Sequence, residues 1–382
     1  MRRIVNKIRP DGTRAIPLAA PVRSGLTEGM EQENDLDPVS LTHLRQVSGT
    51  GPVTCRVHVQ VDQCVEKQTS QGAPYYELRL ADSGGSQTWR VFDGNPVFAE
   101  VRQLQRGNFI EIAAQWVAAG KYGLEPRHPR LRPLTEAEKQ ALLGGDAELV
   151  TRQREDFATI ETLTGALIDP RLRGLCRLFL EKHGARFRRS GAARENHHAR
   201  RGGLVEHVAQ MMRSACAIAT VYPQLNRDLL LTGVLFHDCG KLWENSYPEV
   251  GFAMPYQLHG ELVGHIPLGM ELVNKLWREL LDSPEAAEWT MLEPASDLVR
   301  LHLLHLVAAH HGELEYGSPV LPKTPEAVAL HYVDNLDAKM EMLRRGYETS
   351  QQLAPGIFER FRPWATHVVE PLAAMPPASP AE

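Results

Sequence analysis

The chain has little cysteine, no long hydrophobic run and no excess of basic residues. Its five cysteines are scattered, odd in number and without the paired spacing of zinc fingers or redox motifs, so we expect buried, reduced thiols. No run reaches the length of a membrane span, and the basic N-terminus is not followed by an apolar core. We therefore expect no signal peptide, no membrane partner and a cytoplasmic address.

The charge balance limits the classes of partner. A formal net charge of −5 argues against a protein that coats nucleic acid or an anionic membrane, so any nucleic-acid site must be local. A length of 382 residues suggests about two domains, and a hydrophobic content of 43% is enough for a real core.

The pattern of apolar residues changes along the chain and predicts a small all-β barrel followed by an all-α core. Residues 1–50 have little apolar periodicity and are expected to be extended or disordered. Residues 51–133 alternate apolar and polar positions in about five short runs, the last from Tyr122 to Leu124, with a short helix at 96–104 before the fourth, which is typical of an oligonucleotide-binding (OB) fold. A linker that turns helical (134–160), a helical domain (161–365) and a tail rich in proline and alanine (366–382) follow.

The barrel carries residues suited to a single strand. Tyr76, Trp89 and Phe92 fall on its strands, with Arg90 beside them. Aromatic rings on such a sheet can stack on bases and arginines can hold phosphates, although most strand aromatics fill a core and most charges form a solvated face. We predict nucleic-acid binding by these four residues.

A second basic segment precedes the first strongly apolar helix. Residues 186–201 hold six arginines against one glutamate, and they include Arg194, His197, His198, Arg200 and Arg201. One interpretation is a channel that guides a nucleic-acid backbone; the other is a solvated loop, in which the two histidines cap a helix.

Histidines and aspartates recur beside the helical patterns. His207 lies three residues after Leu204 and four before Met211, which puts its imidazole on the buried side of that helix. Two divalent cations would satisfy five buried imidazoles and two carboxylates at once, and a mixture of nitrogen and oxygen ligands suits Mn²⁺, Fe²⁺, Ni²⁺ or Zn²⁺ better than Ca²⁺. The predicted ligands are His207, His237, Asp238, His265, His310, His311 and Asp334.

This order of His, His-Asp, His, His-His and Asp resembles the HD-domain metal-dependent phosphohydrolases. The motifs Gly-Gly-Leu-Val-Glu-His (202–207), His-Asp-x-Gly-Lys (237–241) and His-His-Gly (310–312) resemble more closely the YhaM family of 3′→5′ exoribonucleases. That family pairs an N-terminal OB fold with an HD domain. The resemblance covers about residues 52–345.

The resemblance implies a role for each ligand. It implies that His207, His237, Asp238 and Asp334 hold one metal, and that Asp238 bridges to a second. His265, with His310, His311 or both, would hold that second metal. Asp238 and Lys241 would be the catalytic residues, with Lys241 facing the phosphate and offsetting its charge. The extra glutamate ligand of some HD phosphodiesterases is absent, because Gly203 stands four residues before His207.

The sequence therefore predicts a metal-dependent 3′→5′ exonuclease that degrades single-stranded RNA to nucleoside 5′-monophosphates, with single-stranded DNA as an alternative substrate. Two alternatives stay open. One is an HD-domain nucleotide or cyclic-dinucleotide phosphohydrolase, and the other is a non-catalytic nucleic-acid-binding protein. Homo-oligomerisation is also left open.

Overall fold

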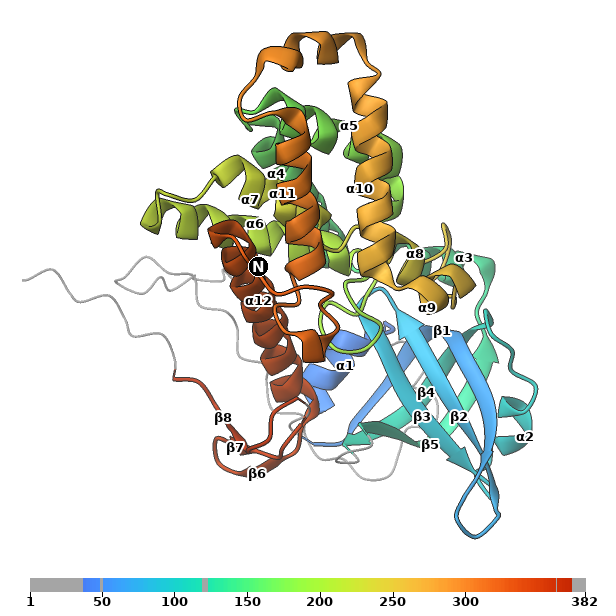
Figure 1. The fold of residues 1–382 in the computed structure, drawn as a ribbon. Helices are drawn as coiled ribbons and strands as arrows, with labels where there is room; N and C mark the ends of the chain where they lie inside the picture. Colours follow the sequence, from blue (N-terminus) through green and yellow to red (C-terminus); the bar gives the residue numbers. More distant parts are fainter. Residues whose placement is uncertain (1–36, 49–50, 119–122, 362, 373–382) are drawn as a thin grey trace, which may run out of the picture. The chain divides into compact units, whose positions relative to one another are not determined.

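A computed structural model describes residues 37–48, 51–118, 123–361 and 363–372. Predictions for residues 1–36, for Tyr122 and for the end of the tail from residue 373 lie outside these ranges. The described chain forms a five-stranded sheet followed by a helical region (Figure 1).

All five strands of the sheet are antiparallel, in the order β3-β2-β1-β4-β5. The first half of β1 pairs with β4 and its second half with β2, with a register shift between Val61 and Gln63. This bend makes the sheet barrel-like, although β3 and β5 do not close it with a ladder. A short helix, α2 (Phe98–Val101), precedes β4, as predicted. The strands are β1 (Val53–Gln68), β2 (Pro74–Asp82), β3 (Gly85–Phe92), β4 (Phe109–Ala118) and β5 (Leu124–Pro133).

Alternation along β1 explains the core of the barrel. Val57, Val59 and Val61 are fully buried, because every second side chain of a strand points to the same face. Helix α1 (Leu41–Ser48) packs Leu41 and Leu44 into the same core. Residues 41–48 are therefore helical, and our prediction of an extended segment to residue 50 is wrong there, since two leucines three residues apart form one apolar helix face.

The fifth strand differs most from its prediction. We expected it at 122–124, whereas β5 runs from Leu124 to Pro133 and contains three prolines. Proline lacks the amide hydrogen that a central strand must donate, but it is tolerated at a sheet edge. β5 is an edge strand, which is why residues 125–133 do not have the pattern of a strand.

The predicted linker is helical. Thr135 caps α3 (Glu136–Gly144) by accepting a hydrogen bond from the Glu138 amide, and the Glu138 side chain bonds back to the Thr135 amide. Helix α4 (Ala147–Gly165) follows after two residues, Gly145 and Asp146, which cap α3 and α4 in turn.

The helical region agrees with the predicted all-α core. Its helices are α5 (Pro170–Phe187), α6 (Gly203–Val221), α7 (Arg227–Phe236), α8 (Lys241–Glu244), α9 (Leu258–Val263), α10 (His265–Leu281), α11 (Ser296–Ala309) and α12 (Pro325–Thr349), with short 3₁₀ turns η3 (Pro284–Met291) and η4 (Leu314–Tyr316). Three short strands, β6 (Gln352–Ala354), β7 (Ile357–Phe358) and β8 (Val368–Val369), form a small sheet after α12.

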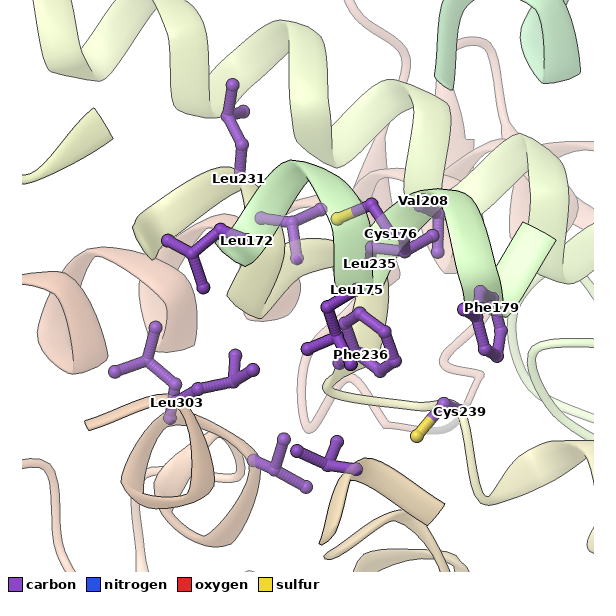
Figure 2. Packing of buried hydrophobic residues seen from close by; sticks show 14 of the residues in the cluster. Leu172, Leu175, Cys176, Phe179, Val208, Leu231, Leu235, Phe236, Cys239 and Leu303 are labelled. Carbon is purple, nitrogen blue, oxygen red and sulfur yellow. The ribbon is translucent and has the colours of Figure 1, made fainter. Parts of the chain in front are cut away.

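A single apolar cluster holds these helices together. In Figure 2 Phe179 of α5 faces Phe236 of α7, and their ring centroids are 5.0 Å apart. Cys176 and Cys239 are buried in the same cluster, and all five cysteines are free thiols. Because this core anchors α6, α7, α10, α11 and α12, it also holds the helix ends that carry the predicted ligands.

Candidate metal centre

The seven predicted ligands come from five helices and meet at one place. His207 lies in the first turns of α6, His237 and Asp238 follow α7, and His265 begins α10. The remaining three are His310 and His311, directly after α11, and Asp334 in α12.

Asp238 is central to the cluster. Its Oδ2 atom lies 3.2 Å from His237 Nε2 and 3.9 Å from His207 Nε2. Its Oδ1 atom lies 3.5 Å from His265 Nε2 and 3.6 Å from His310 Nε2. One carboxylate oxygen thus faces each half of the cluster.

The two halves are separate groups of ligand atoms. His207, His237 and Asp238 offer atoms that all lie within 4.8 Å of one another, and so do His265, His310 and His311. Asp334 joins the first group, because its Oδ1 atom is 3.3 Å from His207 Nε2. In the second group the Nε2 atoms of His265 and His311 are 3.3 Å apart.

Every one of the five imidazoles is held through its Nδ1 atom. His237 and His310 contact the carbonyl oxygens of the residues three positions earlier, at 2.8 and 2.7 Å. His311 contacts the carbonyl of Tyr316 at 2.7 Å. A carbonyl oxygen only accepts hydrogen bonds, so in these three rings Nδ1 carries the proton and Nε2 presents a lone pair.

Carboxylates lie beside the Nδ1 atoms of the other two rings, as a hydrogen-bond acceptor for His207 and as an ion-pair partner for His265. His207 Nδ1 lies 2.6 Å from Asp337 Oδ2, and His265 Nδ1 lies 2.9 Å from Glu244 Oε2. Outer carboxylates of this kind fix the tautomer of a metal-binding histidine. All five Nε2 atoms are therefore directed inward.

The inward atoms fit divalent metal. Among the described residues, His207 Nε2, His237 Nε2, His310 Nε2 and Asp238 Oδ1 are buried and have no hydrogen-bond partner. Buried polar atoms without partners cost free energy, and several lone pairs that face one another repel unless a cation lies between them. Imidazole nitrogen with carboxylate oxygen is a donor set for first-row divalent metals.

The charges of the site reinforce this arrangement. Burial would raise the pKa of Asp238, but Lys241 and His237 hold it well below its usual value. Lys241 Nζ lies 2.5 Å from Asp238 Oδ2. Burial would lower the pKa of His207, but Asp334 and Asp337 outweigh it and raise that pKa to about 9.

Asp337 was not among our predicted site residues. It accepts from His198 Nε2 at 3.0 Å as well as from His207, and it is buried. The available signal was spacing, because Asp337 is three residues after Asp334 and therefore on the same side of α12. Glu244, which holds His265, had no comparable signal.

His197 lies at the edge of the site and His198 lies behind it. The His197 ring centroid is 5.5 Å from that of His207, and burial together with Lys241 lowers the pKa of His197 to about 3. His198 is only 7% exposed and is bound to Asp337, so our prediction that it contacts nucleic acid is wrong in this conformation.

The other basic residues of this segment make internal contacts. Arg200 is bound to Glu206 and, at 2.9 Å, to Glu341, and its contact with a strand stays a prediction. Arg194 donates to the carbonyl of Glu244 at 2.8 Å. Arg201 donates to the carbonyl of Glu249 at 2.9 Å. The excess of arginine in the sequence thus serves largely to hold loops.

The barrel residues divide into core and surface. Tyr76 is 6% exposed and Trp89 is 2% exposed, so these rings fill the barrel and the prediction of base stacking is wrong for both. Arg90 contacts Glu77 at 2.9 Å. Phe92 is 47% exposed and stacks on Tyr75 with ring centroids 5.2 Å apart, which leaves it accessible to a base.

No helix in the described ranges is both long and apolar enough to cross a membrane.

Comparisons with known proteins agree with this geometry. A family model described as "HD domain" matches residues 204–339, which contain all seven ligands. The chain is 34% identical over 283 residues to the 3′-5′ exoribonuclease YhaM of Bacillus subtilis, covering 73% of this chain and 83% of that protein. It is 33% identical over 306 residues to the protein of the same name from a Geobacillus species, covering 79% and 86%.

Proposed function

The chain belongs to the YhaM family of 3′-5′ exoribonucleases, and on that premise we propose that it is a metal-dependent hydrolase that shortens single-stranded RNA from the 3′ end. The observation that carries the proposal is the convergence of five Nε2 atoms on the two oxygens of Asp238. The products are nucleoside 5′-monophosphates, and single-stranded DNA is a possible second substrate.

We assign two divalent cations to the two groups of ligands. His207, His237, Asp238 and Asp334 would hold the first, and His265, His310 and His311 would hold the second, with Asp238 available to both. The donor set suits Mn²⁺, Fe²⁺, Ni²⁺ or Zn²⁺. Cations in such a site neutralise charge on a phosphodiester and lower the pKa of water to near neutrality.

The protein's own residues orient and complete this chemistry. Asp238 sets the spacing between the two groups because each of its oxygens faces one of them. Lys241 is buried beside Asp238 and offsets the negative charge that develops on the phosphoryl oxygens. His197 is neutral at physiological pH and contacts the substrate from the edge of the site.

The barrel directs the choice of substrate. Exposed Phe92, stacked on the half-buried ring of Tyr75, supplies a stacking surface for an unpaired base. A strand uses such a surface, whereas a mononucleotide or cyclic dinucleotide does not need it. The family membership and this pair favour an exoribonuclease over a nucleotide phosphohydrolase or a non-catalytic binding protein. The free thiols of all five cysteines fit the cytoplasm as its location.

The test uses 5′-labelled RNA and DNA oligomers with Mn²⁺, Mg²⁺ or Ni²⁺. The parent should give a ladder that shortens from the 3′ end, and Asp238→Asn should lose it by at least about 10³-fold, since one change removes a ligand from both groups. Asp297→Asn, at an exposed position of α11, is the matched control. Internal cuts, or full activity in Asp238→Asn, would contradict the mechanism. Cleavage of nucleotides without cleavage of oligomers would support the phosphohydrolase instead.

A further inference from the structure

A cavity of about 900 Å³ lies on the far side of His198 and Asp337 from the metal ligands. Helix α1 and the turn between β2 and β3 form one side of it, and α4, α6 and α12 form the rest. Its lining is strongly charged, yet none of the seven metal ligands lines it.

Arg45, in the last turn of α1, is the unusual residue of this cavity. Its side chain lines the cavity, and the residue is only 8% exposed. Its one hydrogen bond within the described chain runs from Nη2 to the carbonyl oxygen of Ser86, at 2.7 Å. A guanidinium has five N–H donors, so most of the donors of Arg45 have no acceptor from the described residues.

Nearby carboxylates are engaged by other arginines. Glu341 is shared by Arg200, at 2.9 Å, and Arg344, at 2.7 Å. Glu348 is bound to Arg344 at 2.6 Å. Within the described ranges no carboxylate oxygen lies within 4.0 Å of the Arg45 guanidinium.

Burial of the Arg45 guanidinium costs free energy when no anion is bound to it. Desolvation lowers the pKa of Arg45, against the opposing effects of Asp82 and Glu348. A single hydrogen bond to a carbonyl does not offset the desolvation of a charge, and an apolar side chain of similar size would avoid that cost. An arginine that is buried in a cavity wall with a single hydrogen bond is suited to bind an anion that enters the cavity from solvent.

We propose that this cavity binds a phosphate group, with Arg45 as its principal ligand. Arginine presents a planar fork of donors that matches phosphate oxygens. Gly85 lies on the barrel side, where an added Cβ would lie 3.9 Å from Arg45 Nη1. Carboxylates and arginines alternate around the rest of the lining, on α4, α6 and α12 alike, so the ligand must be recognised by Arg45 itself rather than by a broad cationic surface.

The phosphate has two possible sources, which share the same chemistry. It is either a backbone phosphate of a bound RNA strand or the phosphate of a free nucleotide. The cavity has room for a mononucleotide. Either ligand would contact the wall that carries His198 and Asp337, which hold the metal ligand His207.

Thermal unfolding of the full chain, with and without added Mn²⁺, tests the site. Sodium phosphate is titrated against sodium chloride at equal ionic strength, and phosphate bound at the metal centre appears as the Mn²⁺-dependent part of the shift in Tm. We expect Arg45→Met to weaken the Mn²⁺-independent response at least tenfold. Arg171→Met is the control, because Arg171 is also buried but is paired with Asp169 at 2.7 Å, and its variant should keep the phosphate response.

An unchanged phosphate response in Arg45→Met overturns the proposal. If that variant does not fold, Arg45→Lys replaces it, since lysine keeps the charge but loses the fork; an unchanged response there overturns the proposal equally. Binding of AMP and of single-stranded RNA to Asp238→Asn protein, each with and without Arg45→Met, separates the sources. If the phosphate belongs to an RNA strand, Arg45→Met should lower the magnitude of the slope of log K for RNA binding against log salt concentration by about 0.7. For a free nucleotide, only AMP binding should weaken.

Discussion

Replacing Asp337 with asparagine should weaken metal binding without touching a ligand. Asp337 accepts from His207 Nδ1 at 2.6 Å and from His198 Nε2 at 3.0 Å, and it is 9% exposed. Both imidazoles bind the same oxygen, Oδ2, and asparagine replaces it with a neutral amide oxygen, so both hydrogen bonds lose their charge assistance. Hydrogen bonds to charged groups contribute about 1.5–3 kcal/mol each, so we expect a loss of roughly 2–3 kcal/mol in the free energy of unfolding.

The effect on metal affinity follows from the orientation of His207. Loss of an outer carboxylate typically weakens metal affinity about 10–100-fold. The pKa of His207 should also fall from about 9, because Asp337 is one of the two carboxylates that raise it. Competition with a chelator measures the metal affinity, and urea unfolding with and without metal measures stability.

Asp297→Asn is the control for this prediction as well, since Asp297 is 82% exposed and contacts only Arg300, at 3.3 Å. It should change stability by less than about 0.5 kcal/mol. If Asp337→Asn bound metal as tightly as the parent, Asp337 would not position His207 and the reasoning from the Nδ1 contacts would fail.

Three further results are expected. The metal-free protein should lose stability as pH rises through about 9, because the pKa of His207 is about 9 in the folded chain and about 6.5 in the unfolded chain. The stabilisation by protonated His207 is fully present below about pH 6.5 and is lost as pH rises through about 9. A urea midpoint that stays constant from about pH 6.5 to about 9.5 would contradict this prediction. Phe92→Ala should weaken binding of RNA to Asp238→Asn protein by about 1–3 kcal/mol, as measured by fluorescence anisotropy, with little change in Tm. Trp89→Ala should do the reverse, lowering the free energy of unfolding by about 3–5 kcal/mol while the folded fraction binds RNA normally; normal stability in that variant would remove Trp89 from the core.

Much of the fold followed from local patterns. The alternation of Val57, Val59 and Val61 predicts a strand with one buried face, and all three residues are fully buried. Thr324 followed by Pro325 predicts a helix start, and the Thr324 side chain accepts from the Ala327 amide at 3.2 Å. Such signals depend on neighbours within one turn or one strand, and therefore the sequence contains them directly.

Predictions failed where a residue's partner is remote in sequence. The arginines before α6 look like a basic surface, yet Arg200 is bound to Glu341, which is 141 residues away. Trp89 and Phe92 have the same aromatic character and lie three residues apart in β3, but one is buried and the other exposed. The side of a strand that faces the core depends on register with its neighbours, which composition does not contain.

For the candidate site, the sequence alone determined which residue types gather and in what order along the helices. It also determined two of the ring orientations, since His237 and His310 each bond a carbonyl three residues earlier. The tertiary structure decided the rest: Asp337 reaches His207 across 130 residues, and Asp238 presents one oxygen to each group. The reason is physical, because convergence of lone pairs depends on how helices pack in three dimensions, and that packing is set by a core contributed by the whole helical region.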